Sequence, residues 1–340
     1  MKNAKKYSWS EYFGDLDKVD QTHNGTALYD NESCNNYYVF ECTFEDCTEN
    51  GAIYIKEFDI TYTLLEDSIF NRCKSTSEDG GGSVYLSISS GSSVQQRNCY
   101  IKSIAADYFM AFFQYCFNKN YIFEISVSNC GENESVGEGT FLIYYGDIRI
   151  KNNNSTYNKC SCVSSITSFL VRRSGYCNFS TFRENNSTVG GSLGFASGYD
   201  SDIYTVSYCN VIGNNCGTDS EQYIFGCSCN TTVEQCVFLN NTAVYMFYIE
   251  SEGFTLTITD SFVESKSTTG PGIVKFERDR IDPETISISH LDIANCLIGL
   301  KVTISKVSYF FCDCSKFNFT FGKKMIDCII FWSIFVFILR

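Results

Sequence analysis

Paired carboxylates are the first candidates for chemistry, and the closest pair in this chain is Asp200 and Asp202. Two carboxyl groups at a suitable separation perform the acid–base steps of glycoside hydrolysis. This pair falls on a predicted loop, with no histidine nearby and no repeated partner, so a solvated turn is the favoured interpretation. We therefore predict no catalytic residue and expect the chain not to be an enzyme.

Cysteine and histidine are the next candidates, because thiolate and imidazole groups bind zinc. The chain has 19 cysteines but only two histidines, His23 and His290, and neither lies near a cysteine pair in sequence. Zinc sites usually show Cys-x2-Cys spacing, whereas these pairs are Cys-x-Cys. Residues i and i+2 of a strand share a face, so buried thiols are favoured over disulfides, and both over a metal. We predict no metal and no cofactor. The pairs are Cys160/Cys162, Cys227/Cys229 and Cys312/Cys314.

Three further segments contain residue types that occur in ligand-binding loops. Asp15–Asp20 is rich in aspartate but lacks the central glycine and closing glutamate of an EF-hand. Gly80–Gly82 is not followed by Lys-Ser/Thr or by a helix, so it is not a phosphate loop. Arg278–Asp282 is interpreted as an exposed, salt-bridged turn that joins two coils.

The elements that would position these residues follow a degenerate repeat of about 28 residues. One signature is an aromatic residue followed three places later by Cys or Asn, and the other is a Gly pair or near-pair before a small residue and an aliphatic one. The glycines suit bends where a side chain would clash or where φ is positive. Predicted apolar anchors recur at Phe44, Phe70, Tyr100, Val127, Tyr157, Phe182, Val211, Phe238, Phe262 and Ile293.

Between the turns the pattern alternates with period two, as in Thr255–Thr259 and Ile286–Ser289. The segment 104–117 is interpreted as a strand pair. We predict an all-β fold, a single right-handed parallel β-helix of about ten coils, and the steady period disfavours a β-sandwich. The predicted domains are an irregular cap at 1–33, the β-helix at 34–315 and an apolar tail at 316–340.

These motifs resemble those of right-handed β-helix proteins of the pectin-lyase-like superfamily. More narrowly, they resemble polymorphic outer-membrane, autotransporter-type repeat proteins and their relatives on protist surfaces. Asn50–Ile53, Gly81–Val84 and Gly190–Leu193 match the family's Gly-Gly-Ala-Ile signature. Phe182–Asn185 and Phe238–Asn241 match its Phe-x-x-Asn signature. Cys47 and Cys73 replace the Asn of that signature in two other copies.

The resemblance implies a surface or membrane-associated protein used in adhesion or display. The chain departs from the bacterial members in having more cysteine and no expected C-terminal barrel domain. Superfamily members often cleave polysaccharides, but the Gly-His-Gly and Arg-x-Lys elements of the related hydrolases do not occur here. We therefore expect a non-enzymatic binding protein, with a carbohydrate-active lyase or hydrolase as the alternative.

Charge and termini bear on the partners and the location. A net charge of −13 disfavours nucleic acid and anionic membranes as partners. The first ten residues lack the apolar core of a secretory signal. The apolar run 328–339 predicts membrane association, with a buried apolar cap as the alternative. The 23 tyrosines and 29 phenylalanines fill inward ladders or form an outer strip for protein or glycan partners.

Asn-x-Ser/Thr sequons are more frequent than chance placement of these residue types would give. They predict either a glycosylated exterior or turn and ladder chemistry, and the sequence leaves both interpretations open. The eleven sequon asparagines are Asn24, Asn31, Asn133, Asn153, Asn154, Asn178, Asn185, Asn186, Asn230, Asn240 and Asn318.

Overall fold

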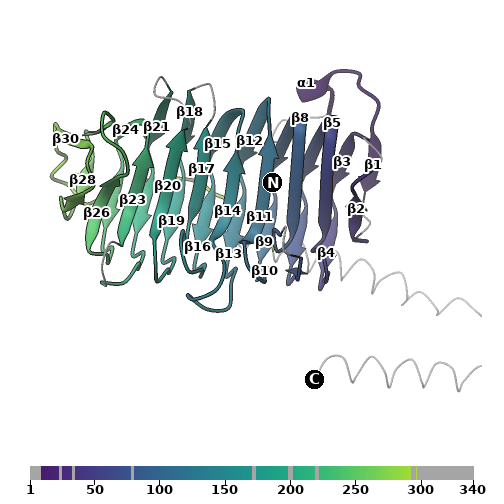
Figure 1. Ribbon diagram of the computed structural model, residues 1–340, viewed down its shortest axis with the longest axis horizontal. Helices are drawn as coiled ribbons and strands as arrows, with labels where there is room; N and C mark the ends of the chain where they lie inside the picture. The colour runs from purple at the N-terminus through teal and green to yellow at the C-terminus, as the bar shows by residue number, and fades with distance from the viewer. Residues whose placement is uncertain are drawn as a thin grey trace, which may run out of the picture. The chain divides into compact units, whose positions relative to one another are not determined.

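The chain folds as a parallel β-solenoid of about eight turns with a repeat of about 27 residues (Figure 1). The structure is a computed structural model that describes residues 9–22, 25–32, 35–77, 80–170, 174–197, 202–218, 222–291 and Cys296. Every strand pairing within these residues is parallel, and the strands stack in sequence order along the long axis. The predicted all-β parallel solenoid is confirmed, with somewhat fewer turns than the ten that we expected.

Each turn contributes strands to three columns, two of which belong to one 19-stranded sheet. The first column contains β2 (Leu28–Asp30), the start of β5 (Ile53–Glu66), the start of β8 (Val84–Gln96), β11 (Phe109–Cys116), β14 (Gly139–Tyr144), β17 (Ile166–Leu170), β20 (Gly191–Ser197), β23 (Tyr223–Ser228), β26 (Tyr245–Ile249) and β29 (Thr268–Thr269). The second contains β1 (Val19–Thr22), β3 (Tyr37–Phe40), the ends of β5 and β8, β12 (Lys119–Phe123), β15 (Asp147–Lys151), β18 (Gly175–Asn178), β21 (Ile203–Ser207), β24 (Asn230–Glu234), β27 (Thr255–Thr259) and β30 (Ile273–Glu277).

The third column is a separate nine-stranded sheet. It contains β4 (Thr43–Glu45), β6 (Ile69–Asn71), β9 (Cys99–Ile101), β13 (Ser126–Ser128), β16 (Asn154–Thr156), β19 (Thr181–Arg183), β22 (Asn210–Ile212), β25 (Val237–Leu239) and β28 (Phe262–Val263). A small pair, β7 (Lys74–Ser75) and β10 (Ile104–Ala105), and one short helix, α1 (Trp9–Phe13), complete the described elements. The predicted strand at Thr255–Thr259 is confirmed as β27, and the predicted strand pair within 104–117 as β10 and β11. The domain boundaries after residues 33 and 315 stay predictions.

Inward side chains of the third column form the predicted anchor ladder. The rings of Phe44 and Phe70 stack with their centroids 5.0 Å apart, and those of Phe70 and Tyr100 at 4.7 Å. All three side chains are fully buried, so the ladder contributes to the continuous core inside the solenoid. The residues in register are Phe44, Phe70, Tyr100, Val127, Ser155, Phe182, Val211, Phe238 and Val263.

Two predicted anchors are wrong, and a third, Ile293, lies outside the described residues. Ser155 holds the fifth position, whereas Tyr157 occupies the following corner with a φ of 59° and is 48% exposed. Val263, and not its neighbour Phe262, pairs with Phe238. Aromatic character was used to set the register in both cases. Phe262 lies one residue from the inward position and so takes the other face, whereas Tyr157 lies two residues past it, at the corner outside β16.

The corner after the third column bends through one residue in the left-handed region, and the next residue joins an inward ladder. In the fifth to seventh turns these inward residues are Asn158, Asn185 and Asn214. The Asn185 side chain oxygen accepts a hydrogen bond from the Asn158 backbone N–H at 3.0 Å, and Asn214 receives the corresponding bond from Asn185 at 3.1 Å. This ladder accounts for the Cys-or-Asn signature, with Asn158 in place of the predicted Cys160. The left-handed corner residues include Asp46, Arg72, Lys102, Asn129, Tyr157, Glu184 and Asn240.

Close approach of atoms from a neighbouring turn explains the glycine pairs at 81–82 and 190–191, whereas Gly51 of the near-pair has a positive φ of 78°. A Cβ on Gly82 would lie 2.2 Å from the Met110 carbonyl oxygen. A Cβ on Gly191 would lie 2.3 Å from the ring of Tyr223 in the next turn. Neither glycine has a positive φ. The predicted clash of a side chain with neighbouring atoms is therefore confirmed as the reason for glycine at these two positions.

After β30 the chain turns back along the third column, and we call residues 280–290 the strap. Asn210 and Ile286 exchange two hydrogen bonds, both 2.9 Å long, and His290 Nε2 lies 2.6 Å from the Thr181 hydroxyl. Farther along, Cys296 forms a disulfide with Cys99 of β9. The predicted strand at Ile286–Ser289 is wrong, because its backbone bonds the side chains of Asn210 in β22 and of Asn152 at a corner and does not extend a sheet.

Candidate functional site

The predicted carboxylate pair does not form a site in the described residues. Asp200 lies outside them, and Asp202 is buried, where it accepts a hydrogen bond from the Ser197 hydroxyl at 2.6 Å. The interpretation of Asp202 as part of a solvated turn is therefore wrong, since this carboxylate lies inside the fold.

The cysteines mostly behave as predicted. Cys160, Cys227 and Cys229 are buried free thiols and Cys162 is partly exposed, whereas Cys312 and Cys314 lie outside the described residues. Burial raises the pKa of the Cys229 thiol to about 11, so it stays protonated at neutral pH. Within the described ranges, no group of three or more His, Cys, Asp or Glu side chains could hold a metal ion.

The other two loop segments are occupied by local ion pairs. Lys18 pairs with Asp20 at the start of β1, and His23 lies outside the described residues. Arg278 binds Asp260 through two hydrogen bonds of 2.9 and 2.7 Å, and Lys266 pairs with Asp279. The segment 278–282 is thus salt-bridged as predicted, but it leads into the strap and does not join two coils.

The feature that stands out on the surface is a cluster of five partly exposed rings, which we call the aromatic cluster. Ring centroids lie 5.7 Å apart between Tyr115 and Tyr144, and 5.0 Å between Tyr144 and Phe169. Tyr145 lies 4.3 Å from Tyr144 and 5.5 Å from Phe117. Phe117 is 45% exposed. Aromatic pairs at these separations attract one another, so the cluster holds its shape while facing solvent.

Strand register creates the aromatic cluster. Tyr115, Tyr144 and Phe169 occupy one outward position in β11, β14 and β17, three consecutive turns. Phe117 follows the end of β11, and Tyr145 sits at the corner after β14 with a φ of 70°. Adjacent strands of a sheet lie about 4.8 Å apart, which is close to the separation that stacked rings prefer.

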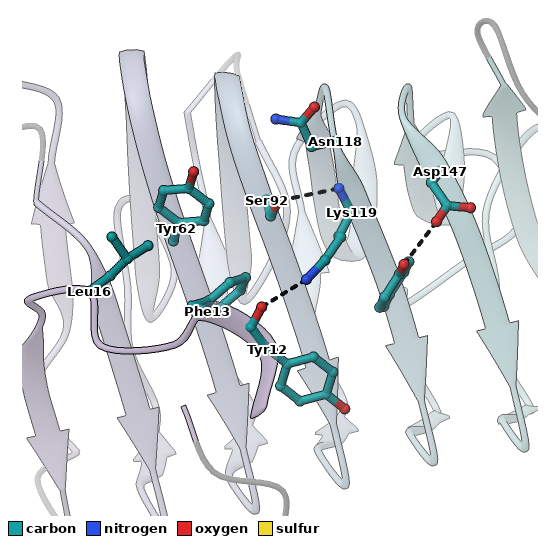
Figure 2. Close-up of a pocket in the computed structure, with 9 residues that line it drawn as sticks. Tyr12, Phe13, Leu16, Tyr62, Ser92, Asn118, Lys119 and Asp147 are labelled. Atoms are coloured by element: carbon teal, nitrogen blue, oxygen red, sulfur yellow. Dashed lines mark hydrogen bonds between the residues drawn. The ribbon is translucent and has the colours of Figure 1, made fainter. Parts of the chain in front are cut away.

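A groove of about 510 Å³ has lining residues close in sequence to the aromatic cluster. Asn118 directly follows Phe117, and Asp147 lies two residues after Tyr145. Figure 2 shows Lys119 reaching across it from β12 toward the backbone of α1. Lys119 Nζ donates to the Tyr12 carbonyl oxygen at 2.7 Å and lies 5.9 Å from the centre of the Phe13 ring. The groove is lined by Tyr12, Phe13, Leu16, Tyr62, Ser92, Asn118, Lys119, Tyr121 and Asp147.

The helix that forms one wall of this groove is anchored by its own aromatic residues. Trp9 and Phe13 are buried against Leu64 and Val94, which face outward from the ends of β5 and β8. The Trp9 indole N–H donates to the Leu16 carbonyl oxygen at 2.9 Å. These contacts cover the outer face of the second column near the N-terminal end, so the groove has a fixed wall (Figure 1).

The hydroxyls of Tyr121 and Tyr144 are protonated at neutral pH. Burial and a 2.8 Å hydrogen bond to Asp147 raise the pKa of Tyr121 to about 12. Burial and the neighbouring Tyr145 hydroxyl raise the pKa of Tyr144 to about 12. Asp147 also pairs with Arg149 at 3.0 Å. The site therefore offers ring faces edged by the hydroxyls of Tyr121 and Tyr144, beside the side chains of Lys119 and Asp147.

A second groove, of about 520 Å³, lies at the corner after the third column. Arg72, Lys74, Lys102 and Lys159 all line it, which is a local excess of cations on a chain with a net charge of −13. The sequence did not indicate this groove, because its lysines come from different turns and meet only when the turns stack.

The fold and these surfaces define a parallel β-solenoid repeat protein. Comparison with protein-family models, with curated proteins and with solved structures gave no match to this chain. Within the described residues, no helix is both long and apolar enough to cross a membrane. The predicted apolar segment 328–339 lies outside those residues.

Proposed function

We propose that this chain is a non-enzymatic binding protein that recognises a glycan through the aromatic cluster and the groove beside α1. The aromatic cluster is the observation that carries the proposal. Its five rings, Tyr115, Phe117, Tyr144, Tyr145 and Phe169, are partly exposed on three consecutive turns. Contiguous exposed apolar surface is rare on soluble proteins unless it contacts a partner.

The chemistry of the surface favours a glycan over an apolar partner. Ring faces pack against the apolar faces of sugars, while groups at the ring edges exchange hydrogen bonds with sugar hydroxyls. The hydroxyls of Tyr144 and Tyr145 lie among the rings, and Asn118 and Lys119 lie in the adjoining groove. The extended run of turns suits a polymer, because equivalent positions recur at about 4.8 Å along the axis.

We place this binding protein at a cell surface or membrane. Disulfides persist in oxidising compartments, and Cys99–Cys296 is one. The sequon asparagines Asn31, Asn133 and Asn240 are exposed, as glycan acceptors must be. The resemblance to right-handed pectin-lyase-like and outer-membrane repeat proteins, and the apolar run 328–339, support the same proposal.

Binding to a panel of immobilised polysaccharides tests the proposal. We expect the native chain to bind at least one member, and the double substitution Tyr115→Ser with Tyr145→Asn to weaken that binding about tenfold or more, since each lost ring contact is worth about 1 kcal/mol. Asparagine suits the positive φ of residue 145. The matched control is Phe179→Asn with Tyr208→Asn, which removes another exposed ring pair, stacked at 4.9 Å. Equal loss in both variants, or no binding across the panel, would contradict the proposal.

The same panel tests the absence of catalysis. We expect no release of reducing ends and no unsaturated product after prolonged incubation with the native chain. Cleavage that disappears in Asp202→Asn, with the fold intact by circular dichroism, would establish the enzyme alternative instead.

A further inference from the structure

Two cysteines of neighbouring turns meet near the first end of the third column. Phe44 and Phe70 are register partners, so Cys47 and Cys73 hold equivalent positions three residues later. The Lys74 backbone N–H donates to the Cys47 carbonyl oxygen at 2.7 Å, which extends the register to this corner. The two side chains therefore stack one turn apart, at the inter-strand spacing of about 4.8 Å.

The two thiols differ in exposure. Cys73 is fully buried, whereas Cys47 is partly exposed. The reason is position: β4 is the terminal strand of the third column among the described residues, so no earlier turn of that column covers Cys47. A second pair of stacked cysteines, Cys209 and Cys236, is completely buried. Of these two pairs, only Cys47 and Cys73 combine a solvent-accessible thiol with a buried one.

Spacing and ionisation both suit exchange chemistry. Adjacent parallel strands lie about 4.8 Å apart, within the range of about 4.4–6.8 Å that a disulfide spans between Cα atoms. The hydrogen bond from Cys73 lowers the pKa of Cys47 to about 7, against the opposing effects of burial and of the Asp46 carboxylate. A large fraction of Cys47 is therefore thiolate at neutral pH, and thiolate is the reactive form.

Cations line the groove at the corner outside this pair, although the two cysteines belong to the inward ladder and do not themselves line it. Asp46 and Thr48, which flank Cys47, line the second groove together with Arg72, Lys74 and Lys102. Arg72 is bound to Asp46, but Lys74 and Lys102 are exposed and make no ion pair with any described residue. These two ammonium groups favour an anionic molecule in the groove.

We propose that Cys47 and Cys73 form a thiol–disulfide exchange site for anionic low-molecular-weight disulfides. The Cys47 thiolate attacks one sulfur of the disulfide, forms a mixed disulfide and releases one small thiolate. That thiolate takes the proton of Cys73, and the Cys73 sulfur then attacks Cys47 and displaces the second small thiolate, which gains a proton from water. The protein loses two hydrogen atoms and the small disulfide becomes two thiols.

Peptide mass spectrometry after treatment with oxidised glutathione tests the proposal, with cationic cystamine as the comparison. We expect a Cys47–Cys73 crosslink in the native chain that forms several-fold faster with oxidised glutathione than with cystamine. Cys73→Ser should accumulate the glutathione adduct on Cys47. Cys47→Ser should form neither adduct nor crosslink. Cys162→Ser, which removes the other free thiol that is partly exposed among the described residues, should behave as the native chain.

A pH profile separates this site from an accessible cysteine of no special reactivity. The alkylation rate of Cys47 by iodoacetamide should reach half its maximum near pH 7 in the native chain. In Cys73→Ser the midpoint should rise toward the ordinary thiol value, because the thiol donor is lost. An unchanged midpoint, a crosslink that does not form, or equal rates with the two disulfides would overturn the proposal.

Discussion

At the scale of single residues, Asn185 shows how one buried polar side chain can tie neighbouring turns together. Its amide group donates to the Ser155 carbonyl oxygen at 3.0 Å and to the Ser165 hydroxyl at 2.9 Å. Its side chain oxygen accepts from the Asn158 backbone N–H at 3.0 Å. The ladder therefore satisfies backbone groups at a corner where no strand partner is available.

Replacing Asn185 should lower the free energy of unfolding. Asn185→Ala would leave the buried Asn158 backbone N–H without an acceptor, and we expect a loss of about 3 kcal/mol in the free energy of unfolding. Urea unfolding followed by circular dichroism measures this. Asn133→Ala is the control, because Asn133 is exposed and bonds only its own loop, and it should change stability by less than about 0.5 kcal/mol. Similar losses in the two variants would show that the ladder has no special role.

A second residue-scale prediction concerns Glu66, whose side chain is completely buried beside Arg97. Tyr38 donates to one carboxyl oxygen at 2.8 Å and Gln96 to the other at 2.9 Å. Burial raises the pKa of Glu66, although Tyr38 and Arg97 act to lower it. Folding therefore favours the protonated form. The contribution to stability is complete below the ordinary glutamate pKa and is lost as the pH rises through the raised value.

Glu66→Gln should remove this dependence, because the amide keeps the shape and does not ionise. We expect the melting temperature of the native chain to fall, relative to that of Glu66→Gln, as the pH rises above the ordinary glutamate pKa of about 4.3. Thermal unfolding of both proteins over a series of pH values gives the comparison. Parallel profiles would show that Glu66 is ionised in the folded chain with an ordinary pKa.

At the scale of elements, the sequence predicts strands well and their faces less well. Period-two alternation located β27 to the residue, because polar and apolar side chains alternate strictly there. The same alternation at Ile286–Ser289 was misleading, since a strap lying across the solenoid also turns alternate side chains toward it. Helix α1 was not predicted, because five residues are too few for a period to emerge.

The sequence predicted the type of residue at the candidate site but not which residues form it. Composition indicated a surplus of aromatic residues, and an outer strip was one of the two uses that we considered. Which rings meet depends on register between turns: Tyr115 and Tyr144 are in register although they lie in different repeats. Unequal repeat lengths hide that register in the sequence, because each corner absorbs a different number of residues.

The prediction at this scale concerns the disulfide that follows the strap. Cys99–Cys296 closes a sequence separation of 197 residues and ties the chain beyond the strap to β9. Cys296→Ser should lower the free energy of unfolding by about 3 kcal/mol, because the unfolded chain regains the freedom that the crosslink removes. Cys162→Ser, which breaks no crosslink, should have little effect. Thermal unfolding measures both, and equal melting temperatures for Cys296→Ser and the native chain would contradict a stabilising role for the crosslink.

At the scale of the whole molecule, a solenoid of stacked turns has a surface that is mostly corners and outer strand faces. Each turn contacts only its neighbours, so binding features are built from residues of adjacent repeats. This is why the aromatic cluster and the cationic groove both span several turns while the interior keeps one continuous core.

Sequon occupancy is the whole-molecule prediction, because it tests the proposed location and the fold together. Asn153 and Asn185 are buried in ladders, so we expect no glycan on either in the folded chain. Asn31, Asn133 and Asn240 are exposed, so we expect glycans there if the chain enters the secretory pathway. The measurement is the mass shift of natively expressed protein on N-glycosidase treatment, followed by site mapping. A shift confined to exposed asparagines would support the surface proposal. No shift would remove its main support and leave all the sequons as turn and ladder chemistry, while glycans on Asn153 or Asn185 would contradict the solenoid register itself.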